Sequence, residues 1–126
     1  MKDVKILVVD DNKVNQLVAQ KMLKKLGFSA DLADNGLKAV EAIKANAYDL
    51  VFMDVQMPEM DGITATMEIR NQEKIKGAAK KLPIVAMTAN VLGKDKENCL
   101  KAGMDDFLSK PITPAPLSKI LNEWIG

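Results

Sequence analysis

Reactive or polar side chains follow four of the five short apolar runs in this sequence, at the point where each run ends. They are the acidic doublet Asp10 and Asp11, the single Asp54, the hydroxyl of Thr88, and the pair Ser109 and Lys110. The chain contains no histidine, which excludes acid–base catalysis by imidazole and zinc sites of the cysteine–histidine type. Carboxylates, hydroxyls and lysines must therefore carry any chemistry. We assign no reactive residue to the end of the second run.

The acidic residues of this set would repel one another if the fold brought them into one pocket. Unless a positive charge lies among Asp10, Asp11 and Asp54, at least one of them would have to bind a proton. Because their ligand atoms are oxygens only, the pattern favours a hard cation. Mg²⁺ fits better than a Ca²⁺ site built entirely from protein groups, and Mn²⁺ should substitute for it.

Lys110 and Thr88 would add an ammonium group and a hydroxyl donor to the same pocket. Phosphoryl transfer depends on charge neutralisation and on alignment of the reacting groups more than on acid–base residues. The set therefore indicates phosphoryl chemistry, with Asp54 as the nucleophile that forms an aspartyl phosphate.

Each of these residues also has an ordinary structural explanation. Asp10 and Asp11 could cap the helix that follows them, a role that we expect of Asp11 or Asn12 in any case. Asp54 could begin a turn, and Thr88 could cap the next helix. Lys110 could extend its aliphatic stem along the edge of a sheet. What favours function is that all of these side chains fall at the ends of predicted strands.

The apolar runs predict five strands, and stretches of helical periodicity follow them. The strands are Ile6–Val9, Ala30–Ala33, Leu50–Met53, Ile84–Met87 and Phe107–Leu108. The helices are one whose apolar residues recur from Val14 to Leu26, and those over Leu37–Asn46, Ile63–Glu73, Gly93–Ala102 and Pro114–Trp124. We expect Gly27 and Gly103 to end the first and fourth helices. The alternation predicts an α/β fold, an open doubly wound parallel sheet with right-handed crossovers.

The ligand site of such a sheet lies beyond the carboxyl ends of its strands, where the strand order reverses. If the order is the flavodoxin-like 2-1-3-4-5, the first and third strands are neighbours about 4.8 Å apart. Asp10, Asp11 and Asp54 would then share one pocket.

Length and composition indicate a single domain over residues 1–126, since 48% of the residues are apolar and one core is the norm at this length. The net charge of +1 gives no reason to expect a nucleic-acid or membrane partner. Cys99 is the only cysteine and the run Ile6–Val9 is too short for a signal peptide, so we expect a cytoplasmic location. We interpret the charged stretch Asn71–Lys81 as a solvated loop.

Four motifs resemble those of the response-regulator receiver family, in the order and spacing that the family shows. They are VVDDN at Val8–Asn12, MDVQMPEMDG at Met53–Gly62, MTAN at Met87–Asn90 and LSKP at Leu108–Pro111. The similarity extends from Lys5 to Trp124. We therefore expect a flavodoxin-like (βα)5 fold with strand order 2-1-3-4-5, and a signalling switch that accepts a phosphoryl group.

The resemblance implies a role for each site residue. Asp54 would be the phosphoacceptor, and Lys110 and Thr88 would bind the phosphoryl oxygens. Mg²⁺ would be held by Asp11, Asp54, the backbone carbonyl of Gln56 and, through water, Asp10. The phosphodonor would be a histidine kinase or a histidine phosphotransfer protein. The chain would then be a monomer and no free-standing enzyme, although it would catalyse its own phosphorylation and dephosphorylation.

The same resemblance implies a switch made by Thr88 and Phe107, the latter in an aromatic position where tyrosine is common. Its readout would lie on the face made by the fourth helix, the fifth strand and the fifth helix. The Lys110–Pro111 bond would be cis.

Two segments resemble the receivers of hybrid sensor histidine kinases more than receivers fused to DNA-binding outputs. They are DDNKVN at Asp10–Asn15 and CLKAGMDDFLSKP at Cys99–Pro111. The chain would be a stand-alone receiver or one excised from such a kinase.

Other functions fit the sequence less well. Phosphohydrolases of the haloacid-dehalogenase type carry a D-x-D pair after the first strand, whereas Asp10 and Asp11 are adjacent. A receiver-like module that is never phosphorylated would be favoured if Asp54, Lys110 or an acidic residue were missing. Dinucleotide or flavin binding is disfavoured, because the first β–α turn lacks G-x-G-x-x-G and its carboxylates would repel a phosphate.

Overall fold

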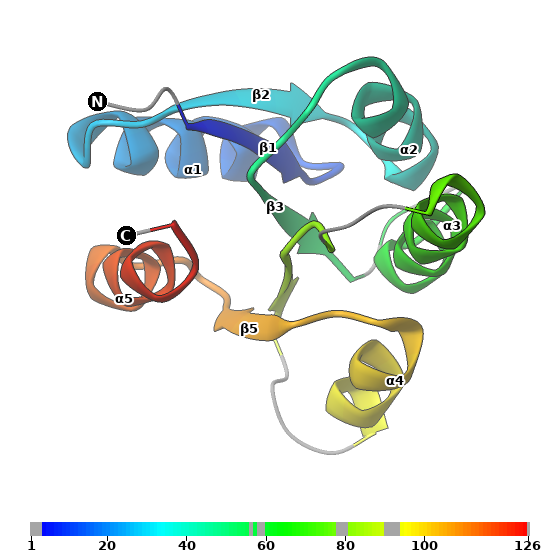
Figure 1. Ribbon diagram of the computed structural model, residues 1–126. Helices are drawn as coiled ribbons and strands as arrows, with labels where there is room; N and C mark the ends of the chain where they lie inside the picture. Colours follow the sequence, from blue (N-terminus) through cyan, green and yellow to red (C-terminus); the bar gives the residue numbers. More distant parts are fainter. Residues whose placement is uncertain (1–3, 56, 58–59, 78–80, 90–93, 126) are drawn as a thin grey trace.

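The computed structural model describes residues 4–55, 57, 60–77, 81–89 and 94–125, in which five strands alternate with five helices (Figure 1). The elements are β1 (Lys5–Val9), α1 (Lys13–Lys25), β2 (Ser29–Ala33), α2 (Gly36–Ala45), β3 (Leu50–Asp54), α3 (Gly62–Lys76), β4 (Ile84–Thr88), α4 (Lys94–Ala102), β5 (Asp106–Ser109) and α5 (Pro114–Ile125). The strands are parallel and lie in the order β2-β1-β3-β4-β5. The predicted flavodoxin-like fold is confirmed.

The sheet is covered on both faces, and its central strands are buried accordingly. All five residues of β3 and of β4 are buried, as expected for parallel strands between two layers of helices. One apolar core lies under α1 and α5, and a second lies under α2, α3 and α4 (Figure 1). Cys99 of α4 belongs to the second core and is fully buried.

The ends of two helices agree with the glycines that were expected to close them. Gly27 follows α1 with φ 93°, and Gly103 follows α4 with φ 109°. The prediction of a loop over Asn71–Lys81 is wrong for its first six residues, because α3 continues to Lys76 and ends at Gly77. Residues 78–80 lie outside the described residues.

Polar side-chain pairs at helical spacing stabilise the second half of α3, and Gly77, with φ 65°, closes the helix. Gln72 donates a hydrogen bond to Glu68, four residues earlier, and Arg70 forms an ion pair with Glu73, three residues later. Such pairs stabilise a helix without any apolar signal. None of the helices in the described residues is long and apolar enough to cross a membrane.

Candidate functional site

Three carboxylates converge at the carboxyl edge of β1 and β3. The two strands pair directly, with Val9 opposite Met53, so the residues that follow meet at the same edge. Asp10, Asp11 and Asp54 each place one carboxylate oxygen within 4.8 Å of the others. Asp10 and Asp54 are buried and Asp11 is exposed. The predicted shared pocket is therefore present.

Lys110 brings a positive charge into this acidic cluster. Its Nζ atom lies 3.0 Å from Oδ2 of Asp10 and 3.2 Å from Oδ1 of Asp54. Burial disfavours the charged ammonium, but the hydrogen bond to Asp10 and the charges of Asp54 and Asp10 outweigh burial and raise the pKa of Lys110. Lys110 therefore stays protonated and partly neutralises the carboxylates, and it does not simply extend along the sheet edge.

The loop that carries Lys110 is fixed against the end of β4. The backbone N–H of Lys110 donates to the carbonyl of Thr88 at 2.9 Å, and the Lys110–Pro111 bond is cis, as expected. Thr88 is buried and lies one residue beyond Met87, which pairs with Asp54. The alternative that Thr88 caps the next helix involves residues 90–93, which lie outside the described residues.

The capping alternatives for the aspartates do not hold. Asn12 caps α1, because its side chain accepts hydrogen bonds from Val14 N and Asn15 N. Asp10 instead accepts from the backbone N–H of Asn12 through Oδ1, which leaves Oδ2 facing Lys110. Asp54 ends β3, and the turn that it could begin continues through residues 56, 58 and 59, which lie outside the described residues.

The start of α3 packs directly against the main chain of Asp54. Asp61 caps this helix by accepting from Thr64 N at 2.7 Å. A side chain at Gly62 would collide with the carbonyl oxygen of Asp54, so only glycine allows this close approach. The predicted ligand carbonyl of Gln56 lies outside the described residues.

An acidic side chain also follows the end of β2, and the sequence analysis assigned no role to it. Asp34 follows β2 and accepts hydrogen bonds from Gln16, Lys38 and Lys13, which lower its pKa well below the usual range. Gln16 itself is 2% exposed and also donates to the backbone carbonyl of Asp10 at 2.6 Å. Asp34 directly follows the predicted second strand, so it was visible in the sequence, whereas a single glutamine in a helix gives no such signal.

The predicted switch residue Phe107 lies half-buried in β5, against the core under α2, α3 and α4. The Nζ atom of Lys96 in α4 lies 5.6 Å from the centroid of its ring, in a cation–π contact. On the other side of β5, Trp124 Nε1 of α5 donates to Asp106 at 2.9 Å. Side-chain contacts thus join α4, β5 and α5.

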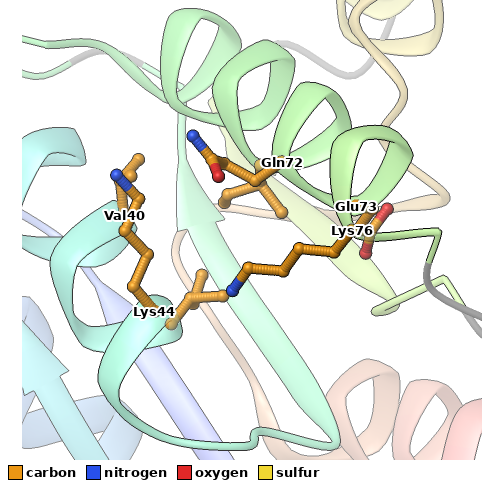
Figure 2. A pocket seen from close by; sticks show the side chains of 7 residues that line it. Val40, Lys44, Gln72, Glu73 and Lys76 are labelled. Atoms are coloured by element: carbon orange, nitrogen blue, oxygen red, sulfur yellow. The ribbon is translucent and has the colours of Figure 1, made fainter.

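A separate apolar pocket lies between α2 and α3, away from the acidic cluster (Figure 2). Val40, Ile43 and Ile69 line it, and Lys44 of α2 and Lys76 of α3 extend along it. Its volume of about 90 Å³ is well below the ≈300 Å³ of typical small-molecule sites. The carboxyl edge of the sheet remains the candidate site.

The chemistry of the acidic cluster fits a small hard cation. Asp10, Asp11 and Asp54 offer oxygen atoms only, and their three carboxylates outnumber the single ammonium group of Lys110. Carboxylate oxygens in this number suit Mg²⁺, which keeps several of its waters.

A family model described as response regulator receiver domain matches residues 6–122. The chain belongs to the response-regulator receiver family. Its fold and its place in two-component and phosphorelay signalling follow from that membership. The similar curated proteins include hybrid signal transduction histidine kinases, as the finer sequence features indicated.

Three of these relatives are much longer than the chain. Hybrid signal transduction histidine kinase B of Dictyostelium discoideum is 52% identical over 115 residues, which cover 86% of this receiver and 6% of that protein. Sensor protein GacS of Pseudomonas syringae pv. syringae is 43% identical, over 97% of this receiver and 13% of that protein. Histidine kinase 5 of Arabidopsis thaliana is 41% identical, over 96% of this receiver and 16% of that protein. The receiver thus spans less than a fifth of each.

Two solved structures are similar over almost the whole receiver. The receiver domain of sensor histidine kinase PA1611 from Pseudomonas aeruginosa PAO1, with a magnesium ion coordinated in its active site cleft, is 46% identical with a TM-score of 0.87, over 99% of both chains. A chain from the complex of the Saccharomyces cerevisiae phosphotransfer protein Ypd1 with the receiver domain of Ssk1 is 38% identical with a TM-score of 0.88, over 97% of this receiver and 88% of that chain.

Proposed function

We propose that residues 1–126 act as one receiver domain in which Asp54 accepts a phosphoryl group from a phosphohistidine, in a Mg²⁺-dependent reaction. The donor is a histidine kinase or a histidine phosphotransfer protein. The observation that carries this proposal is the convergence of three carboxylates and Lys110 at one edge of the sheet.

The transfer needs little acid–base chemistry from this receiver. An oxygen of Asp54 forms a bond to phosphorus while the phosphorus–nitrogen bond of the donor breaks, and the released imidazole takes up a proton. Lys110 leaves its contact with Asp54 to hold a phosphoryl oxygen, and Thr88 donates its hydroxyl to another. Mg²⁺, when held by Asp11, Asp54, the Gln56 carbonyl and, through water, Asp10, supplies the charge neutralisation.

The donor protein docks on the exposed apolar face of α1. Val14, Leu17 and Val18 recur at helical spacing and are 67%, 52% and 40% exposed. Val18 also borders a hollow of about 380 Å³ that reaches Lys110 and Pro111 at the rim of the acidic cluster. Exposed apolar groups that are continuous with a reaction site are typical of protein contact surfaces. The solved Ypd1–Ssk1 complex supports a partner of this class.

Phosphorylation is read out on the face made by α4, β5 and α5. Thr88 ends β4, the next helix in the chain is α4 from Lys94, and the carbonyl of Thr88 holds the loop after β5 through Lys110. A phosphoryl group that draws the Thr88 hydroxyl toward it therefore acts on the segment that leads to α4 and on the loop after β5. Phe107 contacts Lys96 of α4 and packs against the core beneath that helix, so its ring responds to a movement of α4.

The direct test is incubation with Mg²⁺ and acetyl phosphate, followed by intact-mass measurement. We expect one acid-stable, base-labile phosphoryl group per chain, no labelling without Mg²⁺, and none in Asp54→Asn. Asp49→Asn, at an exposed aspartate before β3, should be labelled normally. Turnover of many donors by each chain without accumulation of the labelled form would indicate a phosphohydrolase, and absence of both labelling and turnover would indicate a receiver that is never phosphorylated.

A further inference from the structure

Both main-chain polar groups of Asp10 are tied to the end of β2. Its N–H donates to the carbonyl of Ala33 at 3.1 Å. Its carbonyl accepts from Nε2 of Gln16 at 2.6 Å, and the same nitrogen donates to Oδ1 of Asp34 at 2.9 Å. The Gln16 amide thus bridges the Asp10 main chain to the residue that follows the edge strand.

Two lysines contact the carboxylate of Asp34, which forms the far end of this bridge. Lys13 Nζ lies 3.1 Å from Oδ1 of Asp34, and Lys38 Nζ lies 3.0 Å from Oδ2. Lys13 begins α1 and Lys38 lies in the first turn of α2, so Asp34 is fixed from two helices. A buried amide with both donor directions used has one orientation, and it transmits that orientation to the Asp10 carbonyl.

Asp10 and Asp11 lie in a short turn that must hold two carboxylates close to a third. The mutual repulsion of these charges favours opening of that turn. An anchor on the carbonyl of Asp10, between the two acidic side chains, opposes such opening without touching either carboxylate.

We infer that Gln16, oriented by Asp34, is a positioning residue that holds the turn carrying Asp10 and Asp11 in the geometry that binds the divalent cation. This inference rests on the proposed Mg²⁺-dependent function. Gln16 does not contact Asp54 or Lys110 in any hydrogen bond among the described residues. Its effect therefore falls on cation affinity, and a high concentration of Mg²⁺ should compensate for its loss.

The experiment measures the Mg²⁺ dissociation constant of the whole chain by titration calorimetry. Gln16→Met keeps the length of the side chain and removes the donor, and we expect about tenfold weaker binding, the lower end of the effect of losing a group that orients a ligand. In acetyl phosphate labelling, the same variant should need about tenfold more Mg²⁺ for half-maximal rate and should recover most of the wild-type rate at saturation.

Gln20→Met is the matched control. Gln20 lies one turn further along α1 and donates to the carbonyl of Ala30 in β2 at 3.1 Å, the same kind of bridge but away from the acidic cluster. Its Mg²⁺ affinity should equal that of wild type. Equal weakening by both substitutions would mean a general loosening of α1 and would overturn the inference.

A second pair of variants decides the matter if Gln16→Met does not fold. Asp34→Asn and Asp34→Ala remove the same charge, but only asparagine keeps an oxygen that can accept from Gln16. We expect Asp34→Ala to bind Mg²⁺ several-fold more weakly than Asp34→Asn, and equal affinities would overturn the inference. Wild-type Mg²⁺ affinity in Gln16→Met would also overturn the inference and would leave the proposed function intact. A wild-type protein that binds no Mg²⁺ would contradict both the inference and the proposed function.

Discussion

Charge balance among a few residues governs the acidic cluster. Asp10, Asp11 and Asp54 face one ammonium group, that of Lys110, so the metal-free site carries an excess of negative charge. Lys110 contacts Asp10 and Asp54, and in the described part of the chain no ion pair joins it to the exposed Asp11. The charge of Asp11 is therefore the one that Lys110 offsets least directly.

Asp11→Asn should stabilise the metal-free protein by up to about 1 kcal/mol, because it removes repulsion that no ion pair offsets. The same substitution should weaken Mg²⁺ binding, because it removes a carboxylate ligand. Chemical denaturation with and without Mg²⁺ measures both effects. Glu41→Gln, at an exposed acidic residue of α2, serves as the control and should change neither quantity. If Asp11→Asn left stability and Mg²⁺ affinity unchanged, repulsion within the cluster would not be significant.

The contacts between helices and strands determine how a change at the acidic cluster reaches a distant surface. Phe107 of β5 lies under Lys96 of α4, and Trp124 of α5 donates to Asp106 of β5. The chain has one tryptophan, so its fluorescence reports on this face alone. The switch can change population only through interactions that differ between its two states.

Thr88→Ala should uncouple the readout face from Asp54. In wild type, beryllofluoride with Mg²⁺ should change the emission of Trp124, since a hydrogen bond to the mimic plus the Lys110 contact supplies about 2–4 kcal/mol of bias. Thr88→Ala should lose most of that change, and Phe107→Ala should weaken it. Acetyl phosphate should still label both variants, although more slowly in Thr88→Ala, which loses a donor to the phosphoryl oxygens. A full emission change in Thr88→Ala would show that the coupling takes another route.

Arg70 holds three elements together at the opposite edge of the sheet. From α3 it donates to the carbonyls of Gly103 and Leu82 and to the carboxylate of Asp105. Arg70→Met should destabilise the fold by about 3 kcal/mol, because it leaves both carbonyls without this donor and leaves Asp105 with Lys81 as its remaining ion-pair partner. Lys13→Met breaks an exposed ion pair and should cost far less in the same denaturation experiment. Equal costs would mean that the Arg70 contacts add nothing beyond an ordinary surface pair.

At the scale of the whole molecule, the docking face and the acidic cluster must act as one surface. Leu17→Asp places a charge in the apolar face of α1 and should slow transfer from a phosphorylated histidine phosphotransfer protein at least tenfold, the effect of about 1.4 kcal/mol of lost binding. Labelling by acetyl phosphate should stay normal, because the small donor needs no docking face.

Ile75→Asp is the control for this prediction, since Ile75 is 71% exposed on α3, away from α1. It should leave transfer from the protein donor at the wild-type rate. Slowing of both donors by Leu17→Asp would place the damage in the reaction site, and equal slowing of the protein donor by Ile75→Asp would remove α1 as the docking face.

The sequence alone was sufficient to predict the features of the fold that repeat along the chain, namely the alternation of strands and helices. Parallel strands end at one edge, so the residues after β1 and β3 had to meet once the strand order was assumed. Asp34 directly follows the predicted second strand, but its contacts with Lys13, Gln16 and Lys38 come from two helices whose approach to the end of β2 no local pattern shows. The role of Gln16 depends on a contact between α1 and the end of β2, which no periodicity encodes. The extension of α3 to Lys76 was missed because its last turn is charged, as a loop would be, although Gly77 closes the helix in the left-handed conformation.

Cys99 is buried beneath α4, so the rate of its chemical modification reports how α4 moves away from the sheet. The thiol lies in the core beneath α4 and is inaccessible in the closed fold, so an alkylating reagent reaches it only when the helix lifts or the domain opens. Since it is the only cysteine in the chain, all modification reports opening at this helix, and each opening is trapped once the reagent reacts faster than the helix recloses. The rate at which Cys99 is modified in the wild-type protein therefore measures the opening of the helix that the proposed switch must move, and no label has to be engineered.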